Sequence, residues 1–109
     1  MTKPELEEIL TFPETPLNEG TPEDTVIEAS VRICFWEYVW EPLVASGSEY
    51  NTKVTYQVSV ISEFPRCKEL IELKHKLDKL DLHPIIQHEK DIKTRRWHSY
   101  FSIEVLENV

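Results

Sequence analysis

The side chains best suited to metal chemistry in this 109-residue chain are its histidines. His88 and His98 flank the polar segment KDIKTRR, which has the composition of a hairpin tip. If the flanking segments pair, the two imidazoles could lie nearly opposite each other and bind zinc, or one could ligate haem. No HExxH or CxxC spacing supplies a further ligand. The sequence therefore favours two surface histidines, and we expect no cofactor.

The segment between these histidines is the one concentrated basic patch of the sequence. It contains Lys90, Lys93, Arg95 and Arg96, followed directly by Trp97. Cations beside an aromatic ring can hold a phosphate or a base, but a solvated hairpin tip is the simpler interpretation. Contact with an acidic partner, or with the acidic N-terminal segment of the chain, stays open. A small-molecule or metal-binding module built from His88, His98 and residues 90–96 is the alternative function.

Motifs that indicate an enzyme are missing from the sequence. It contains no GxSxG elbow, P-loop or dinucleotide turn, and two glycines are too few for a loop that cradles phosphate. Cys34 and Cys67 fit two small, buried, reduced side chains. A thiol that meets a histidine only in the folded chain stays open. We expect a protein that is not an enzyme.

The stretch CFWEYVW contains two of the three tryptophans. In a strand, alternate side chains point to opposite faces, so Trp36, Tyr38 and Trp40 are expected to share one face. Aromatic side chains of this size are frequent binding hot spots. Three alternatives remain for what packs on such a face: the apolar N-terminal residues of the same chain, a second copy in a homodimer, or a different protein.

The net charge of −8 is concentrated in the first half of the chain. Residues 1–50 contain eleven acids against two bases, whereas residues 51–109 contain nine acids against ten bases. An acidic surface repels phosphates, which disfavours direct nucleic-acid binding and favours a protein partner with a basic surface. Glu37, Glu41 and Glu49 lie near the aromatic residues and would supply the complementary charge.

The elements that must position these residues follow from composition and periodicity. Residues 1–24 are acidic and rich in proline, and are expected to form an irregular segment that packs on the domain or orders on binding. Its removal should change binding more than the sheet. Residues 25–109 are expected to form a single α+β domain. Alternating and helical patterns predict strands over 25–40, 53–61, 84–89 and 97–106, and an amphipathic helix that starts at Ser62 and runs to residue 80.

This ββαββ order predicts a four-stranded antiparallel sheet with the one helix packed on one face. There is no apolar run of about 18 residues and no apolar leader, so we expect a cytoplasmic protein without a membrane partner. Size, acidity and the aromatic group resemble small inhibitor and immunity proteins, including those of phages and mobile elements. That resemblance is one of type and carries no residue assignments.

We therefore expect a cytosolic protein that acts by stoichiometric protein–protein binding. Its partner would be a basic, nucleic-acid-handling enzyme or a toxin, which it would block. A structural accessory subunit of a larger complex is a further alternative.

Overall fold

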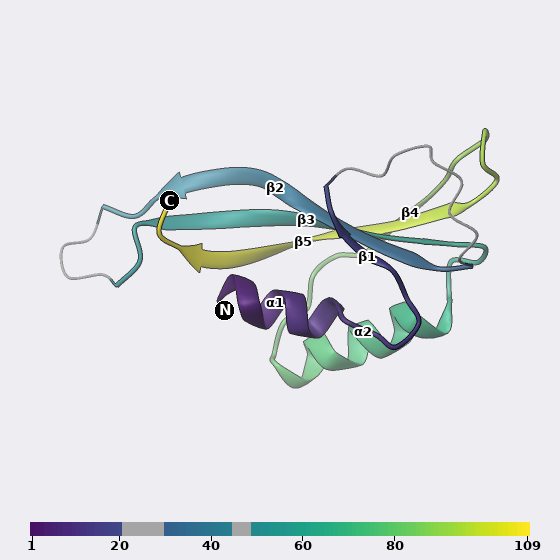
Figure 1. Cartoon of the computed structure of the whole chain (residues 1–109), viewed down its shortest axis with the longest axis horizontal. Coiled ribbons are helices and arrows are strands. Elements are labelled where there is room, and N and C mark those ends of the chain that lie inside the picture. Colours follow the sequence, from purple (N-terminus) through teal and green to yellow (C-terminus); the bar gives the residue numbers. More distant parts are fainter. Residues whose placement is uncertain (21–29, 45–48) are drawn as a thin grey trace.

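The computed structural model describes residues 1–20, 30–44 and 49–109. In chain order the elements are α1 (Lys3–Leu10), β1 (Leu17–Glu19), β2 (Arg32–Pro42), β3 (Thr52–Ser62), α2 (Lys68–Lys79), β4 (Gln87–Lys90) and β5 (Trp97–Glu107). The α+β class is confirmed; β3 and β5 lie close to their predicted positions, α2 lies within its predicted range, and β4 overlaps its predicted range (Figure 1). The described residues form a five-stranded sheet in the order β1-β2-β3-β5-β4. The predicted four-stranded antiparallel sheet is wrong, because β1 adds a strand that runs parallel to β2.

The central strand β3 carries the core. Four alternating side chains of β3 are completely buried: Val54, Tyr56, Val58 and Val60. β5 pairs antiparallel with β3 along its whole length, β2 pairs with it from Thr52 to Ile61, and both place further buried side chains on the same face. The period-two pattern of the sequence thus corresponds to one apolar face of the sheet, which we call the helix face.

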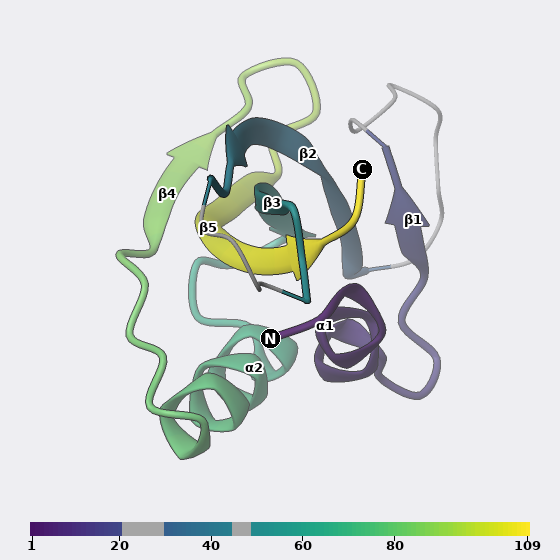
Figure 2. The same ribbon diagram turned by 90° about the vertical axis from the view of Figure 1, so that its left-hand side faces the viewer.

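Both helices cover the helix face and lie side by side (Figures 1 and 2). The predicted leucine stripe of α2 is buried, with Leu70, Leu73 and Leu77 in the core. From α1 and the residue pair that follows it, Leu6, Ile9, Leu10 and Phe12 enter the same core. One helix was too narrow for this sheet, and the N-terminal segment supplies the second.

Lys76 fixes α1 to α2. Its Nζ donates hydrogen bonds to the carbonyl oxygens of Ile9 (3.1 Å) and Thr11 (3.3 Å) and lies 3.8 Å from the centroid of the Phe12 ring. The last carbonyls of a helix lack partners within the helix, so a cation there is favourable.

The N-terminal segment also forms the edge of the sheet. Ile33 N–H donates to Pro16 O (2.9 Å), and Gly20 N–H donates to Phe35 O (2.8 Å). Over the described residues 1–20 the N-terminal segment therefore packs on the domain, one of the two expected arrangements, and it forms α1 and β1 rather than irregular chain. Residues 21–24 lie outside the described residues.

The predicted start of the long helix is also wrong. Ser62 is the last residue of β3, pairs with Trp97, and donates from Oγ to Phe64 O (2.6 Å). The helix begins at Lys68, with Cys67 at the N-cap position. A serine shortly before a proline has the local chemistry of a helix N-cap. Here Ser62 is instead part of β3 and pairs with β5.

Burial of α1 predicts the effect of truncating one of its side chains. Leu6→Ala should lower the free energy of unfolding by about 2–5 kcal/mol, because Leu6 is completely buried and its removal leaves a cavity. The matched control Leu80→Ala, at a half-exposed leucine after α2, should change it by less than about 1 kcal/mol. Urea denaturation measures both, and equal effects would show that α1 is not part of the core.

A histidine bridges two carboxylates where α2 ends. His83 Nδ1 lies 3.1 Å from Asp78 Oδ1, and His83 Nε2 lies 3.0 Å from Asp81 Oδ1. Both ring nitrogens can donate only in the imidazolium form. The hydrogen bonds to Asp81 and then to Asp78 raise the pKa of His83 above its ordinary value of 6.5.

This bridge predicts a pH-dependent contribution to stability. A histidine whose pKa is higher in the folded state stabilises fully below its unfolded pKa and loses that contribution as pH rises through the folded pKa. The stability advantage of the wild type over His83→Gln should therefore be present at about pH 6 and decline toward about pH 8. Urea denaturation across this range measures it. In an Asp78→Asn/Asp81→Asn background the decline should vanish, and a decline that persists there would contradict the assignment.

Candidate functional site

A β-bulge interrupts β2 at the centre of the aromatic stretch. Glu37 pairs with Tyr56 and Val39 pairs with Thr55, so Tyr38 is an extra residue with no place in the ladder. Because side chains alternate with a period of two, one inserted residue moves every later side chain to the opposite face.

The bulge separates the two tryptophans of this stretch. Trp36 pairs with Gln57 and lies on the face opposite the helices, which we call the outer face. Trp40 pairs with Val54 and therefore lies on the helix face. The prediction that Trp36, Tyr38 and Trp40 share one face is wrong, and the cause is the bulge at Tyr38.

The second half of β2 forms a free edge of the sheet. β1 pairs only with Ile33–Phe35, so no described strand pairs with β2 from Trp36 onward on this side. Three adjacent large side chains are exposed there: Tyr38 by 65%, Val39 by 46% and Trp40 by 56%. We call residues 37–40 the edge surface. Figure 1 shows that this end of β2 and β3 projects past the helices.

The backbone of this edge is poorly suited to pairing with another strand. Leu43 N–H donates to Asn51 O (2.9 Å), so the position before it, Pro42, points its backbone away from β3. Proline has no N–H to offer at that position, and a bulge twists an edge out of register. Both features are typical of edges protected from strand addition, so the edge surface presents side chains rather than a free ladder.

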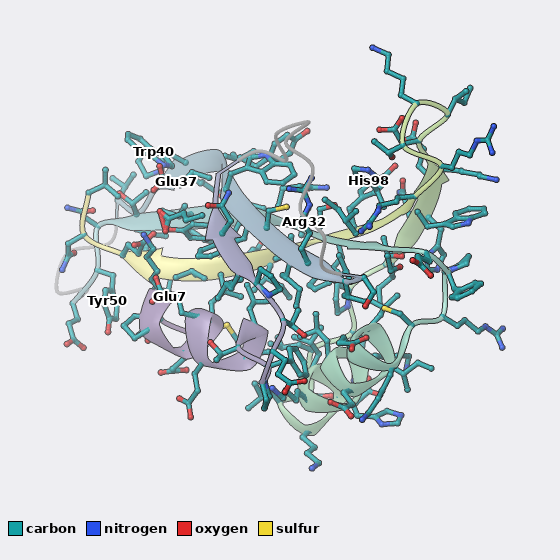
Figure 3. All side chains as sticks on the ribbon, turned by 45° about the vertical axis from the view of Figure 1, so that its right-hand side comes forward. Glu7, Arg32, Glu37, Trp40, Tyr50 and His98 are labelled. Atoms are coloured by element: carbon teal, nitrogen blue, oxygen red, sulfur yellow. The ribbon has the colours of Figure 1, made fainter. Side chains whose placement is uncertain are left out.

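The acidic residues expected around the aromatic group differ in their surroundings. Glu41 Oε2 lies 2.9 Å from Lys53 Nζ, which also lies 3.7 Å from Glu104 Oε1, so the charge of Glu41 is compensated. Glu37 and Glu49 are exposed, and no ion pair of either is found within the described ranges. Figure 3 shows Glu37 beside Trp40 at this end of the sheet. Glu37 therefore supplies the uncompensated charge of the edge surface.

Tyr56, behind the edge surface, is a structural residue. Its hydroxyl donates to Glu107 Oε2 (2.8 Å), and its ring lies 5.8 Å from that of Phe35, centroid to centroid. Burial, then the hydrogen bond and charge of Glu107, and then the charges of Glu37 and Glu19 raise the pKa of Tyr56 far above its ordinary value. The phenol is therefore protonated at neutral pH and acts as a hydrogen-bond donor only.

The predicted basic loop connects β4 to β5, but its cationic side chains do not gather at one site. Lys90 pairs with Trp97 on the side of the helix face. Lys93 and Arg95 are exposed. Arg96 is half-buried and donates from Nη1 to Ser30 O (3.5 Å).

The two candidate metal ligands lie on opposite faces of the β4–β5 pair. His88 pairs with Ser99, and its Nδ1 lies 2.7 Å from Ser99 Oγ, whereas His98 pairs with Glu89. This one-residue offset places the imidazoles on different faces, so the two histidines do not form the pair that the sequence left open. Within the described ranges, no group of three or more His, Cys, Asp or Glu side chains could hold a metal ion.

A trough of about 700 Å³ lies on the outer face, between β2 and the β4–β5 hairpin. Its lining comprises Trp36, Gln57, Ser59, Glu89, Lys90, Asp91, Ile92, Lys93, His98 and Tyr100. Sequence reasoning treated Trp36 and residues 90–97 as separate features. No local signal could have joined them, because they meet only through the strand order β2-β3-β5-β4.

Comparison with known proteins assigns no family to this chain. No protein-family model matches it, and no curated protein matches it significantly. None of the helices in the described part is long and apolar enough to cross a membrane. Function must therefore be inferred from the geometry of the chain itself.

The register of β2 predicts that the bulge is dispensable for folding. Deletion of Tyr38 lets Val39 follow Glu37 directly while keeping its pairing with Thr55, so the free energy of unfolding should stay within about 1 kcal/mol of wild type. Urea denaturation measures it. Deletion of Thr55 is the control: it shifts the register of β3 against both neighbours and should abolish cooperative unfolding. Loss of cooperativity in both deletions would show that the fold itself requires the bulge.

Proposed function

We propose that this protein acts in the cytosol by stoichiometric binding to another protein, with the edge surface as the docking site. The observation that carries the proposal is the run Tyr38, Val39, Trp40. These three consecutive residues have large, exposed side chains at a strand edge that no described strand covers.

The energetics of the edge surface suit a binding hot spot. An aromatic side chain buries about 150–250 Å² when covered and keeps a polar group for hydrogen bonding. Tyrosine and tryptophan are over-represented among residues whose truncation costs at least about 2 kcal/mol of binding. Pairing of β2 with β3 holds the backbone of Trp40 in place before any partner arrives. Less conformational entropy is then lost on binding than for a flexible loop.

Charge supports a basic partner. The exposed Glu37 belongs to the half of the chain that holds eleven acids against two bases. Such a surface attracts a basic groove over about 8 Å at physiological ionic strength and raises the association rate. An enzyme that handles nucleic acid, or a toxin of that kind, has such a groove, and occupation of the groove would inhibit it.

A different protein is a better fit for this edge than a second copy of the chain. A symmetric antiparallel pairing of two β2 edges about Val39 would set Glu37 of each copy opposite Glu41 of the other. Like charges directly opposite each other destabilise a strand pair. A self-associated dimer, or an accessory subunit with no inhibitory effect, is an alternative outcome of the test below.

The proposal predicts that Tyr38→Ala/Trp40→Ala lowers affinity for the partner about a hundredfold or more, because two hot-spot side chains are lost. Tagged wild-type protein would capture the partner from an extract of the source cells, and calorimetry with the purified pair would give affinity and stoichiometry. The matched control is Phe64→Ala, which removes a similarly exposed ring at the other end of β3 and should leave affinity unchanged.

Two outcomes would contradict this function. Equal partner affinity of the double variant and Phe64→Ala would exclude the edge surface as the docking site. A double variant that no longer unfolds cooperatively would show that the two rings are structural. If charge steers the encounter, the association rate of the wild type should also fall as salt is raised.

A further inference from the structure

The trough on the outer face has an aromatic wall and a polar floor. Trp36 pairs with Gln57 in one row of the sheet, and Ser59 pairs with Tyr100 in the next row on the same face. The two rings therefore flank the floor diagonally across β3. A volume of about 700 Å³ lies within the range of roughly 300–1,000 Å³ that is usual for ligand sites.

The floor of the trough carries the hydroxyl group of Ser59. Ser59 is 2% exposed and lines the trough, and no hydrogen bond of its Oγ is found in the part of the chain that the structure describes. A hydroxyl can donate or accept a hydrogen bond, so Ser59 offers a polar group to a ligand in the trough.

Two carboxylates, those of Glu89 and Asp91, line the trough. Glu89 pairs with His98 across β4 and β5 on the outer face, and no ion pair of Glu89 is found within the described ranges. The backbone N–H of Lys93 donates a hydrogen bond to Asp91 Oδ1 (2.9 Å), and this bond is the main reason that the pKa of Asp91 is lowered. Asp91 is therefore ionised at neutral pH.

Fewer cations than the sequence suggests face this trough. By alternation with Glu89, the side chain of Lys90 points to the other face of β4. His98 Nε2 lies 3.9 Å from Asp91 Oδ2 and faces that carboxylate. Lys90 is nevertheless among the lining residues, together with Lys93, which is exposed at the tip of the hairpin.

We propose that this trough binds the guanidinium group of an arginine side chain of the protein partner. A planar guanidinium stacks on aromatic rings such as Trp36 and Tyr100, pairs bidentately with a carboxylate such as Glu89, and donates to a hydroxyl such as Ser59. The source of the arginine rests on the proposed function. The site itself is separate: Figure 3 shows His98, at the trough, at the end of the sheet opposite Trp40.

The trough can be tested with a small probe before the partner is known. Acetyl-arginine-amide would be titrated into the full chain while the indole N–H signal of Trp36 is followed by NMR. The isosteric, uncharged acetyl-citrulline-amide is the matched probe. Arginine should shift the Trp36 signal at millimolar concentration, and citrulline should bind about tenfold or more weakly, because it cannot pair with a carboxylate.

Two charge variants give the sign of the interaction. Glu89→Gln should weaken arginine binding about five- to tenfold, whereas Lys93→Gln, which removes a like charge, should leave it equal or strengthen it. Glu5→Gln on α1 is the control and should change nothing. Cooperative unfolding of each variant shows that the fold is retained.

Three results would overturn the inference. They are equal binding of the citrulline probe, no change with Glu89→Gln, or preferred binding of acetyl-glutamate-amide that Lys93→Gln abolishes. The last would make the trough an anion site. Probe binding does not involve Tyr38 or Trp40, so its failure leaves the edge surface untouched. Partner binding that survives Tyr38→Ala/Trp40→Ala would refute the proposed function and not the trough.

Discussion

The fold depends on the need to close one very apolar sheet face. Alternate residues of β3 from Val54 to Val60 are completely buried, and neighbouring strands extend the same surface. One helix of about 10–12 Å diameter cannot cover three such strands. The chain uses both α1 and α2 for this purpose, so in the part of the chain that the structure describes neither helix shields the outer face. The outer face can therefore carry a trough with polar and aromatic side chains.

The bulge at Tyr38 determines on which face of the sheet each tryptophan of β2 lies. If Tyr38 were paired in a regular ladder, Trp36 and Trp40 would lie on the same face of the sheet. With the bulge, Trp36 becomes a wall of the trough and Trp40 belongs to the edge surface. The same residue protects the edge from indiscriminate strand pairing, because a bulged ladder is a poor template for another chain. Exposed aromatic side chains on an edge are thus retained with less tendency to aggregate.

The charge that each surface presents depends on which charged side chains are paired in the fold, and not only on the amino-acid composition. Glu41 and Lys53 compensate each other across β2 and β3, and Lys76 is used to hold α1. Glu37 and Glu89, for which no ion pair is found among the described residues, lie at the edge surface and the trough. We therefore propose a cationic partner group at each surface, although the basic residues of the chain are concentrated in its second half.

The sequence by itself determined the elements that have strong local periodicity. Alternation located β3 and β5 to within about one residue, and leucines spaced three and four apart located the buried stripe of α2. Tertiary structure decided which face the residues around Leu6 cover, that Tyr38 is an inserted residue, and that His88 and His98 are offset by one pair. Periodicity is a property of neighbouring residues, whereas packing face and strand register depend on hydrogen bonds and contacts between residues far apart in the chain.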